Sequence, residues 1–328
     1  MKQMRILFGL IIGCGFFCLA TSSTLGAASF PTKPITMIVP SNPAGSFDIQ
    51  ARAIASVAKK HFGVPVIVEN VPGASFTLGA AKLARSRPDG YTLHSSSEAP
   101  WTMAPITLDV AYDPLKDVEY LCSTAVNYQV VAVNSKLPFK TMLELLDYVK
   151  KNPKKIRVSY SSTLQEFWLY NFIDAGYEFT PVVFTGGGPA AVACGGGHTD
   201  VNMGSLAAAQ GLIESGNMRL LAYTPCTPGS IPVKNAPGSC ELPPQIADCF
   251  IPVRVGVHAP KGIPKDRLEF LEKAMSSVFN DKEYRDMLEK LGFKTDWVGH
   301  KEDTERYHKL YKKMLVVGEK HGLMKKKK

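Results

Sequence analysis

The chain contains 328 residues, of which 45% are hydrophobic and 20% are charged, and its formal net charge is +9. A chain of this size and composition can bury enough apolar surface for two packed domains, which excludes a largely disordered protein. The positive charge gathers in two runs, at residues 150–155 and 325–328, with no aromatic residues spaced among the basic ones. This pattern predicts no nucleic-acid binding and leaves room for a bias toward anionic ligands.

Residues 1–28 have the order of a secretory signal peptide. Lys2 and Arg5 precede an uncharged run at residues 6–20, and small residues follow this run. The run is also somewhat shorter than the roughly 20 apolar residues that a membrane-spanning helix needs. We therefore predict export and cleavage near residue 28. A retained anchor, and a lipoprotein attached through Cys14, stay open as alternatives.

Strands and helices alternate in the chain after the signal. The first expected strand, residues 35–40, is followed by a turn and then by apolar residues at helical spacing up to Gly63. Two further strands are expected at residues 64–69 and 91–95, with a helix between them. This alternation is typical of an α/β unit with a parallel sheet.

A second set of elements begins near Val130 and includes a capping box, Thr141 to Glu144, at the start of a helix. Its remaining strands are expected at residues 156–160, 180–184, 199–203 and 218–224. A proline-rich loop at residues 225–247 follows. Beyond it the sequence predicts a strand at 251–259 and helices at 265–280, 281–291 and 301–321.

Two α/β sets with few residues between them predict a protein of two lobes. The first lobe is expected to comprise residues 29–127 and 251–328, and the second residues 128–250, with hinge positions near Tyr128 and Phe250. Ligands of open α/β sheets bind outside the carboxyl ends of the strands. The expected site is therefore a cleft between the lobes.

Two strand-to-helix loops combine small residues with a following helix. In the first, Ala44 and Gly45 precede Ser46, which is the expected N-cap; in the second, Gly73 begins a run of small residues before Thr77. Backbone N–H groups at a helix N-terminus favour an anion, so the pair of loops is suited to a carboxylate or a phosphate. The alternative is that both loops are ordinary turns.

Motifs of known catalytic chemistry are missing from the sequence. It has no P-loop lysine, no nucleophile elbow and no His-Glu-x-x-His motif, and its mature part has no Cys-x-x-Cys. His94, His198 and His258 are isolated and are expected at the surface or in the core. We therefore expect no metal, no cofactor and no enzymatic activity. A secreted hydrolase that uses Ser41 or Asp48 is kept only as an alternative, because no complete set of catalytic partners can be named.

The cysteines permit one disulfide in the mature chain. Cys226, Cys240 and Cys249 share a region rich in Pro and Gly, and an oxidising compartment allows a bridge there. We favour Cys240 with Cys249. Free buried thiols are the alternative.

Five segments stand in an order that carries a resemblance. They are PTKPITMIVPSNPAGSFDIQAR, GVPVIVENVPGASFTLGA, RSRPDGYTL, YDPLKD and LPFKTMLELLDYVKKNP. Together they resemble the Bug family of periplasmic solute receptors of tripartite tricarboxylate transporters, over essentially the whole mature chain. The resemblance implies a two-lobed, type II-like Venus-flytrap protein of the periplasm. Such a monomer closes on an organic acid and delivers it to a membrane permease. A receptor of the same fold that presents its ligand to a sensor kinase is the alternative.

The resemblance also implies which residues bind the ligand. The family grips one carboxylate with the two loops described above. Glu98 and Trp101 follow the third strand and could also face the cleft, although core packing is the alternative for Trp101. The full expected set is Ser41, Asn42, Pro43, Ala44, Gly45, Ser46, Asp48, Gly73, Ala74, Ser75, Phe76, Thr77, Glu98, Trp101, Ser161, Ser162, Thr163, Gly204 and Ser205.

The sequence departs from the family pattern at several of these positions. Ser75 and Phe76 stand where two glycines are usual, and Gly204 stands where Asp is common. A side chain as large as Phe76 would narrow or line the pocket, so an aromatic or less polar acid becomes a credible ligand. The alternative is that Phe76 turns into the core of its lobe and leaves the pocket polar.

Overall fold

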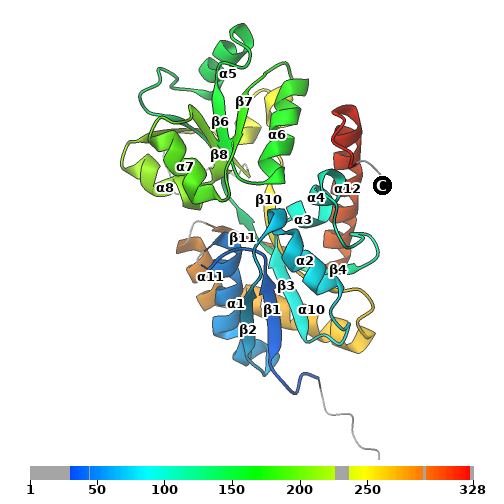
Figure 1. The fold of residues 1–328 in the computed structure, drawn as a ribbon. Helices are drawn as coiled ribbons and strands as arrows, with labels where there is room; N and C mark the ends of the chain where they lie inside the picture. Colours follow the sequence, from blue (N-terminus) through cyan, green and yellow to red (C-terminus); the bar gives the residue numbers. More distant parts are fainter. Residues whose placement is uncertain (1–29, 44, 226–235, 291–292, 326–328) are drawn as a thin grey trace, which may run out of the picture.

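The computed structural model describes residues 30–43, 45–225, 236–290 and 293–325, and it forms two lobes (Figure 1). Each lobe is built on its own β-sheet, which confirms the α/β, two-lobed fold class. Within the described ranges, no helix combines the length and the apolar character that a membrane crossing requires. The proposed signal peptide and Cys14 lie outside the described residues.

The sheet of the first lobe has six strands in the order β11-β4-β10-β3-β1-β2. Their bounds are β1 Ile35–Val39, β2 Val66–Asn70, β3 Thr92–Ser96, β4 Val118–Asn127, β10 Val253–Pro260 and β11 Phe293–Gly299. Strand β1 pairs in parallel with β2 and β3, whereas β10 is antiparallel to both β3 and β4, and β11 is antiparallel to β4. The parallel unit expected from the first three strands is therefore confirmed, and β10 and β11 add antiparallel pairings to this sheet.

Helices cover both faces of the first sheet. On one face, α1 (Ser46–Phe62), α10 (Lys265–Asn280) and α11 (Lys282–Lys290) bury one apolar core against the strands. On the other face lie α2 (Thr77–Ala84), the short helices α3 (Ala99–Thr102) and α4 (Ala104–Thr107), and α12 (His300–Lys320). Burial on both faces gives the central strands long apolar runs rather than strict alternation.

The sheet of the second lobe has five strands in the order β7-β6-β8-β5-β9. Their bounds are β5 Gln129–Asn134, β6 Arg157–Tyr160, β7 Thr180–Val183, β8 Val201–Ser205 and β9 Met218–Thr224. Helices α5 (Met142–Lys151) and α6 (Thr163–Asp174) pack on one face, and α7 (Gly187–Gly195) and α8 (Leu206–Glu214) pack on the other. A 3-10 turn, η2 (Ser239–Glu241), and a short helix, α9 (Pro244–Ala247), lie in the segment that we expected to be an unstructured loop.

The chain passes from the first sheet into the second through a single residue. Strand β4 ends at Asn127, Tyr128 follows, and β5 begins at Gln129. Because β4 and β3 are both antiparallel to β10, strands β1, β2 and β3 run in the same direction as β4, toward the second lobe. In the second sheet, Gln129 at the start of β5 pairs with Ser205 at the end of β8, and β6 and β7 run parallel to β8. The carboxyl ends of the parallel strands of both sheets therefore face the junction between the lobes.

The last helix contacts both lobes. Helix α12 packs on β4, β11, α3 and α4 of the first lobe, and its C-terminal part reaches α6 of the second. There Asp174 pairs with Lys320 at 2.6 Å and with His321 at 2.9 Å. Helices α10 and α11 pack on α1. We retain residues 29–127 with 251–328, and 128–250, as the proposed division into lobes.

The disulfide prediction is wrong in its pairing. Cys240 is disulfide-bonded, but Cys249 is a free, buried thiol, and Cys226 lies outside the described residues. The Cys249 Sγ donates to the carbonyl of Gln245, at 3.3 Å, within the short turn of α9. Burial raises the pKa of this thiol to about 12, so Cys249 is an inert part of the core.

Two histidines that are isolated in the sequence meet in the core of the first lobe. His94 on β3 and His258 on β10 are paired residues of the antiparallel ladder, both fully buried, and their Nδ1 atoms lie 3.5 Å apart. His258 Nε2 also lies 2.9 Å from the hydroxyl of Tyr307. Burial lowers the pKa of both rings, that of His94 to about 3. Both are therefore neutral in the folded protein at neutral pH.

This pair makes the stability of the protein dependent on pH. The unfolded chain takes up a proton on each histidine as the pH falls below about 6.5, while the folded protein does not, so stability is retained above that pH and lost below it. At about pH 5 the loss amounts to roughly 2 kcal/mol per buried histidine. We expect His94→Gln to lose correspondingly less free energy of unfolding than the wild type between about pH 7.5 and about pH 5 in urea titrations. Equal losses in the two proteins would contradict the assignment.

Candidate functional site

Five helices begin where the two sheets face each other. In the first lobe, α1 and α2 follow β1 and β2; in the second, α6, α7 and α8 follow β6, β7 and β8. The loops before these helices are short and contain no Lys or Arg: residues 40–46, 71–77, 161–163, 184–188 and 204–205. The helix N-termini thus bring backbone N–H groups and the positive ends of helix dipoles to the junction. The junction can attract an anion without a basic side chain in these loops.

The first loop approaches α1 through Gly45. The Gly45 backbone N–H donates to the carbonyl of Asn42 at 3.1 Å. Gly45 is the N-cap of α1, one residue earlier than the predicted Ser46. A Cβ at Gly45 would come within 2.9 Å of the Ser41 Oγ and 3.0 Å of the Asn42 carbonyl. Only glycine fits here, and its bare backbone leaves the first turn of α1 accessible. Ala44 lies outside the described residues.

Asp48 supports this loop from behind. Its buried carboxylate accepts hydrogen bonds from Asn70 Nδ2 at 2.9 Å and Arg52 Nε at 2.8 Å. The same Asn70 nitrogen donates to the carbonyl of Ser41 at 2.9 Å. Through Asn70, Asp48 therefore joins the first loop to the end of β2, and a contact between Asp48 and the ligand stays a prediction.

The second loop has an unusual backbone. Gly73, Ala74, Ser75 and Phe76 all have positive φ angles, of 130°, 46°, 52° and 75°. Non-glycine residues in the left-handed region cost roughly 1–2 kcal/mol each, which explains why glycines suit the positions of Ser75 and Phe76. Thr77 holds the turn through a hydroxyl bond to the carbonyl of Ala74 at 2.8 Å. Such local strain is typical of ligand-binding loops.

The Phe76 side chain belongs partly to the core. Its ring packs edge-on against the buried Phe47, with 5.3 Å between ring centroids, and it is half-buried against neighbouring core residues. Phe76 also packs against the apolar cluster that contains most of the second lobe's core, and part of the residue is exposed, so both placements of the ring stay predictions.

The strain in the second loop predicts a stabilising substitution. Ser75→Gly removes the cost of the positive φ, offset by the roughly 0.5–1 kcal/mol of extra chain entropy that glycine loses on folding. We expect the variant to be more stable than the wild type by up to about 1 kcal/mol in thermal or urea unfolding. Ser56→Gly is the matched control, because Ser56 is exposed inside α1 at a helical φ, and this change should destabilise. A Ser75→Gly variant less stable than the wild type would mean that the backbone at Ser75 is not strained.

Two predicted site residues have no exposed surface. Trp101 has no exposed surface; its ring packs against His94 and Tyr112, and its Nε1 donates to Ser96 Oγ at 3.3 Å. The possibility that it faces the cleft is therefore wrong. The residues after β3 did not indicate on which side of the first lobe the indole ring of Trp101 would pack.

Glu98 is also a structural residue. Its fully buried carboxylate accepts from the Arg254 backbone N–H, at 3.0 and 3.1 Å, and from Arg306 Nη1 at 2.7 Å. Arg306 in turn pairs with the buried Asp303 at 2.7 Å. Burial raises the pKa of Glu98, while the Arg306 guanidinium opposes that shift. The network joins the start of α3 to β10 and α12 near the lobe junction, and a contact between Glu98 and the ligand stays a prediction.

The second lobe presents hydroxyl groups at its helix N-termini. Ser162 and Ser205 are the N-caps of α6 and α8, and the Ser205 hydroxyl accepts from the Ala208 N–H at 3.4 Å. Thr163 is buried, and its hydroxyl has no hydrogen-bond partner among the described residues. The hydroxyl of Ser41 in the opposite lobe also lacks one within the described ranges. Unpaired buried hydroxyls on both sides of the junction are available to a ligand.

The start of α7 is a site element that the sequence did not predict. Gly186 is its N-cap, and a Cβ at Gly187 would lie 3.9 Å from the hydroxyls of both Ser161 and Ser205. The three helix N-termini of this lobe therefore meet around these serines. A strand, a glycine run and a helix stand in the sequence here, which is the same signal that identified the first lobe's loops.

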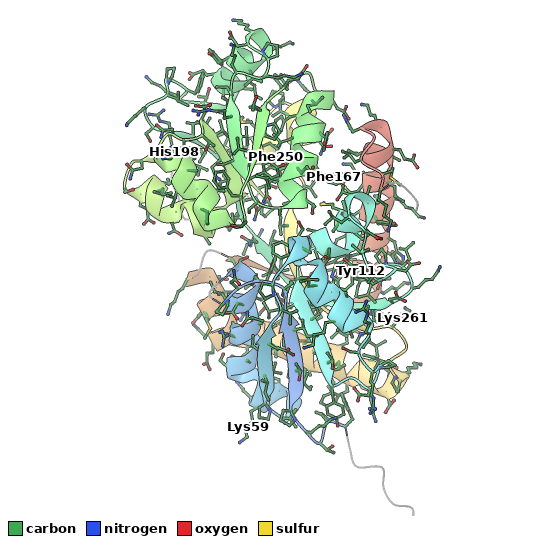
Figure 2. The ribbon with its side chains drawn as sticks, viewed as in Figure 1. Lys59, Tyr112, Phe167, His198, Phe250 and Lys261 are labelled. Carbon is green, nitrogen blue, oxygen red and sulfur yellow. The ribbon has the colours of Figure 1, made fainter. Side chains whose placement is uncertain are left out.

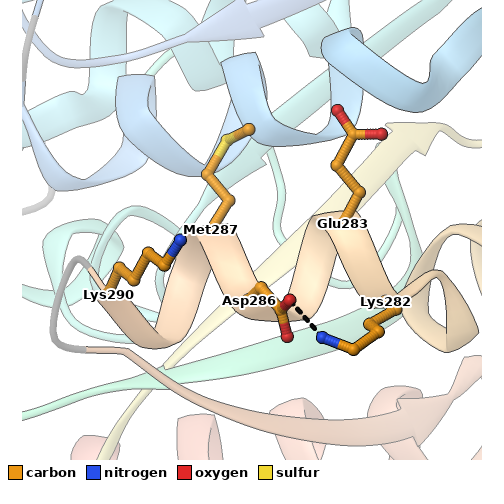
Figure 3. A pocket seen from close by; sticks show the side chains of 5 residues that line it. All are labelled: Lys282, Glu283, Asp286, Met287 and Lys290. Atoms are coloured by element: carbon orange, nitrogen blue, oxygen red, sulfur yellow. Dashed lines mark hydrogen bonds and ion pairs between the residues drawn. The ribbon is translucent and has the colours of Figure 1, made fainter.

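Other features lie outside the junction. His198 is exposed on the second lobe, whereas Phe167 and Phe250 lie in that lobe's core (Figure 2). A surface hollow is lined by five residues of α11 alone, among which Lys282 and Asp286 form an ion pair (Figure 3). None of these five belongs to the loops at the junction. The residues that the structure describes contain no group of three or more His, Cys, Asp and Glu that could hold a metal ion.

Solved structures share this architecture. A protein described as a periplasmic transporter superposes with a TM-score of 0.78 at 29% identity, covering 90% of this chain and 99% of its own. The periplasmic binding protein BugD gives 0.76 at 22% identity, covering 90% and 100%. A Rhodopseudomonas palustris protein named MatC, with bound malate, gives 0.76 at 23% identity, covering 88% and 100%. The fold is thus that of the two-lobed periplasmic binding proteins.

The sequence comparisons define the family. The model of the tripartite tricarboxylate transporter family receptor matches residues 50–317, and the chain belongs to this family of solute-binding receptors. A protein of Cupriavidus necator, described as a UPF0065 protein in the gbd 5'region, is 30% identical over 302 residues, covering 91% of this chain and 90% of the relative. Protein BugT of Bordetella pertussis is 27% identical over 294 residues, covering 86% of each chain.

Proposed function

We propose that the protein binds an organic acid between its lobes and delivers it to the membrane permease of a tripartite tricarboxylate transporter. One observation carries the proposal: glycine-containing loops and helix N-termini from both sheets converge on one junction, and these loops contain no charged side chain. Such a surface holds a carboxylate through backbone N–H groups and helix dipoles. The protein would act as a monomer in the periplasm.

The ligands named for similar proteins support this class. MatC is described with bound malate, and another R. palustris protein, with a TM-score of 0.79, is described with adipate. Both ligands are carboxylic acids. We assign one carboxylate to residues 45–46 and 73–77 of the first lobe. The second lobe would close on the remainder of the molecule about the crossings near Tyr128 and Phe250.

A hydrolase is not supported by the arrangement of side chains. The Ser41 hydroxyl has no hydrogen-bond partner in the part of the chain that the structure describes, and Asp48 is engaged by Arg52 and Asn70. A serine nucleophile needs a base within hydrogen-bond reach and a third group that orients the base. The geometry therefore favours binding without chemistry.

The carboxylate site predicts the effect of filling the space at Gly45. Gly45→Val places methyl groups against Ser41 Oγ and the Asn42 carbonyl, so the loop must move and the N–H groups lose their alignment. A screen of mono-, di- and tricarboxylic acids by thermal shift should find an acid that stabilises the wild type, by about 2.7 kcal/mol at a hundredfold excess over the dissociation constant. The same acid should give no shift with Gly45→Val.

Gly211 provides the matched control for this substitution. It lies in α8, and a Cβ there would meet nothing within 4 Å. Gly211→Val should keep the full ligand-induced shift. A folded Gly45→Val protein that binds as tightly as the wild type would place the carboxylate elsewhere.

A further inference from the structure

A buried polar site lies in the sheet of the second lobe, where Asn202 and Ser159 adjoin. On β8, the residues on either side of Asn202 are Val201 and Met203, and both face the core that α5 and α6 cover. The polar site therefore lies on the other face of the sheet, which α7 and α8 cover. Side chains alternate between the faces of a strand, so Asn202 and Gly204 face the α7 side. Asn202 is central in the sheet, paired with β5 on one side and with β6 on the other, and only 1% of it is exposed.

The orientation of the Asn202 amide follows from its neighbours. Its Nδ2 lies 3.2 Å from the Oγ of Ser159 and 3.4 Å from the Ser159 carbonyl. That carbonyl can only accept, and the Ser159 hydroxyl donates to the carbonyl of Val201 at 3.2 Å, so both groups require a donor from Asn202. The nitrogen therefore faces Ser159, and the oxygen faces the opposite way. Among the described residues, this buried Oδ1 has no hydrogen-bond partner.

The Asn202 Oδ1 atom lies on the side of the amide that is nearer to the junction between the lobes. A Cβ at Gly204 would lie 3.1 Å from Asn202 Oδ1, and the nearest described atoms around that position all belong to Asn202. Gly204 is nearer than Asn202 to the carboxyl end of β8, which faces the first lobe. Gly204 thus places no side chain between the buried amide oxygen and the side on which a ligand would enter.

We propose that Asn202 Oδ1 accepts a hydrogen bond from the ligand and that the ligand is an organic acid carrying a hydroxyl or N–H group. This inference rests on the proposed function, because it describes the part of the acid that the second lobe would hold. A buried acceptor without a donor is unfavourable, so an acid that supplies the donor gains affinity over an otherwise identical acid that lacks it. A carboxylate oxygen would be repelled at this point, so the charged end binds the loops of the first lobe.

The placement of the aromatic residues agrees with this assignment. Trp101 lies in the core of the first lobe, and Phe76 packs against Phe47. Trp101 supplies no stacking surface for an aromatic acid, because its side chain is fully buried. Selection by hydrogen bonding at Asn202 discriminates between close analogues more sharply than apolar contact does.

Matched pairs of acids test the inference. Calorimetric titrations would compare malate with succinate, and 3-hydroxybutanoate with butanoate, because the members of each pair differ by one hydroxyl. We expect the hydroxy acid to bind about tenfold or more tightly than its partner in at least one pair. In Asn202→Leu that ratio should fall to near one, while the acid without the hydroxyl keeps its affinity.

Two further variants keep the test decisive. If Asn202→Leu does not fold, Gly204→Ala serves instead, because its methyl group would block access to Oδ1 while leaving Asn202 in place. Asn134→Ala is the control: Asn134 is buried in the same sheet, its Nδ2 donates to the Cys194 carbonyl at 2.7 Å, and its Oδ1 accepts from the Lys136 N–H at 3.0 Å. Asn134→Ala should leave the ratio unchanged.

The outcomes separate this inference from the function on which it rests. If acids bind the wild type with no preference for the hydroxy member of either pair, or if the preference survives in both Asn202→Leu and Gly204→Ala, the Asn202 assignment is overturned and the solute-binding function stands. If neither these acids nor any other carboxylic acid binds the wild type, the proposed function itself is overturned.

Discussion

The architecture depends on the direct connection between strand β4 of the first sheet and strand β5 of the second. With only Tyr128 between β4 and β5, the direction of β4 fixes the direction of β5, and the ladder pairings then orient the remaining strands. As a result, the carboxyl ends of β1, β3, β6 and β8 all face the junction between the lobes. The helices that follow these strands in both sheets begin at this junction. The positive ends of their dipoles therefore point toward the same ligand site.

Recognition through backbone groups explains several features together. The loop before α1 needs glycine at position 45 because a Cβ would collide with its neighbours, and Asp48 and Asn70 hold that loop from behind. The loop before α2 adopts positive φ angles at Ala74, Ser75 and Phe76, in a conformation that glycine would adopt with less strain. Side-chain polar groups without a partner among the described residues lie on both sides of the junction, with the Ser41 hydroxyl in the first lobe and the Thr163 hydroxyl and the Asn202 amide oxygen in the second.

The sequence predicted elements with clear periodicity and missed those without it. Helix 265–280 and strand 218–224 match the structure, because amphipathic spacing and turn residues mark their ends. Strand β4 was missed because it is buried on both faces and carries polar residues such as Ser123 and Asn127. The site loops were identifiable from glycine before a helix. The roles of Trp101, Glu98 and Asp48 were not, because they depend on partners distant in sequence, among them Arg306 and Asn70.

The most direct test is a crystal structure with the acid that gives the largest thermal shift. We predict a carboxylate within hydrogen-bond distance of backbone N–H groups in the loops at residues 45–46 and 73–77 other than those of Gly45, Phe76 and Thr77, which already donate to carbonyls of these loops, with the second lobe closed over the rest of the acid. We also predict that no Lys or Arg side chain contacts that carboxylate. An acid bound outside the junction, or a carboxylate held mainly by basic side chains, would contradict recognition through the backbone.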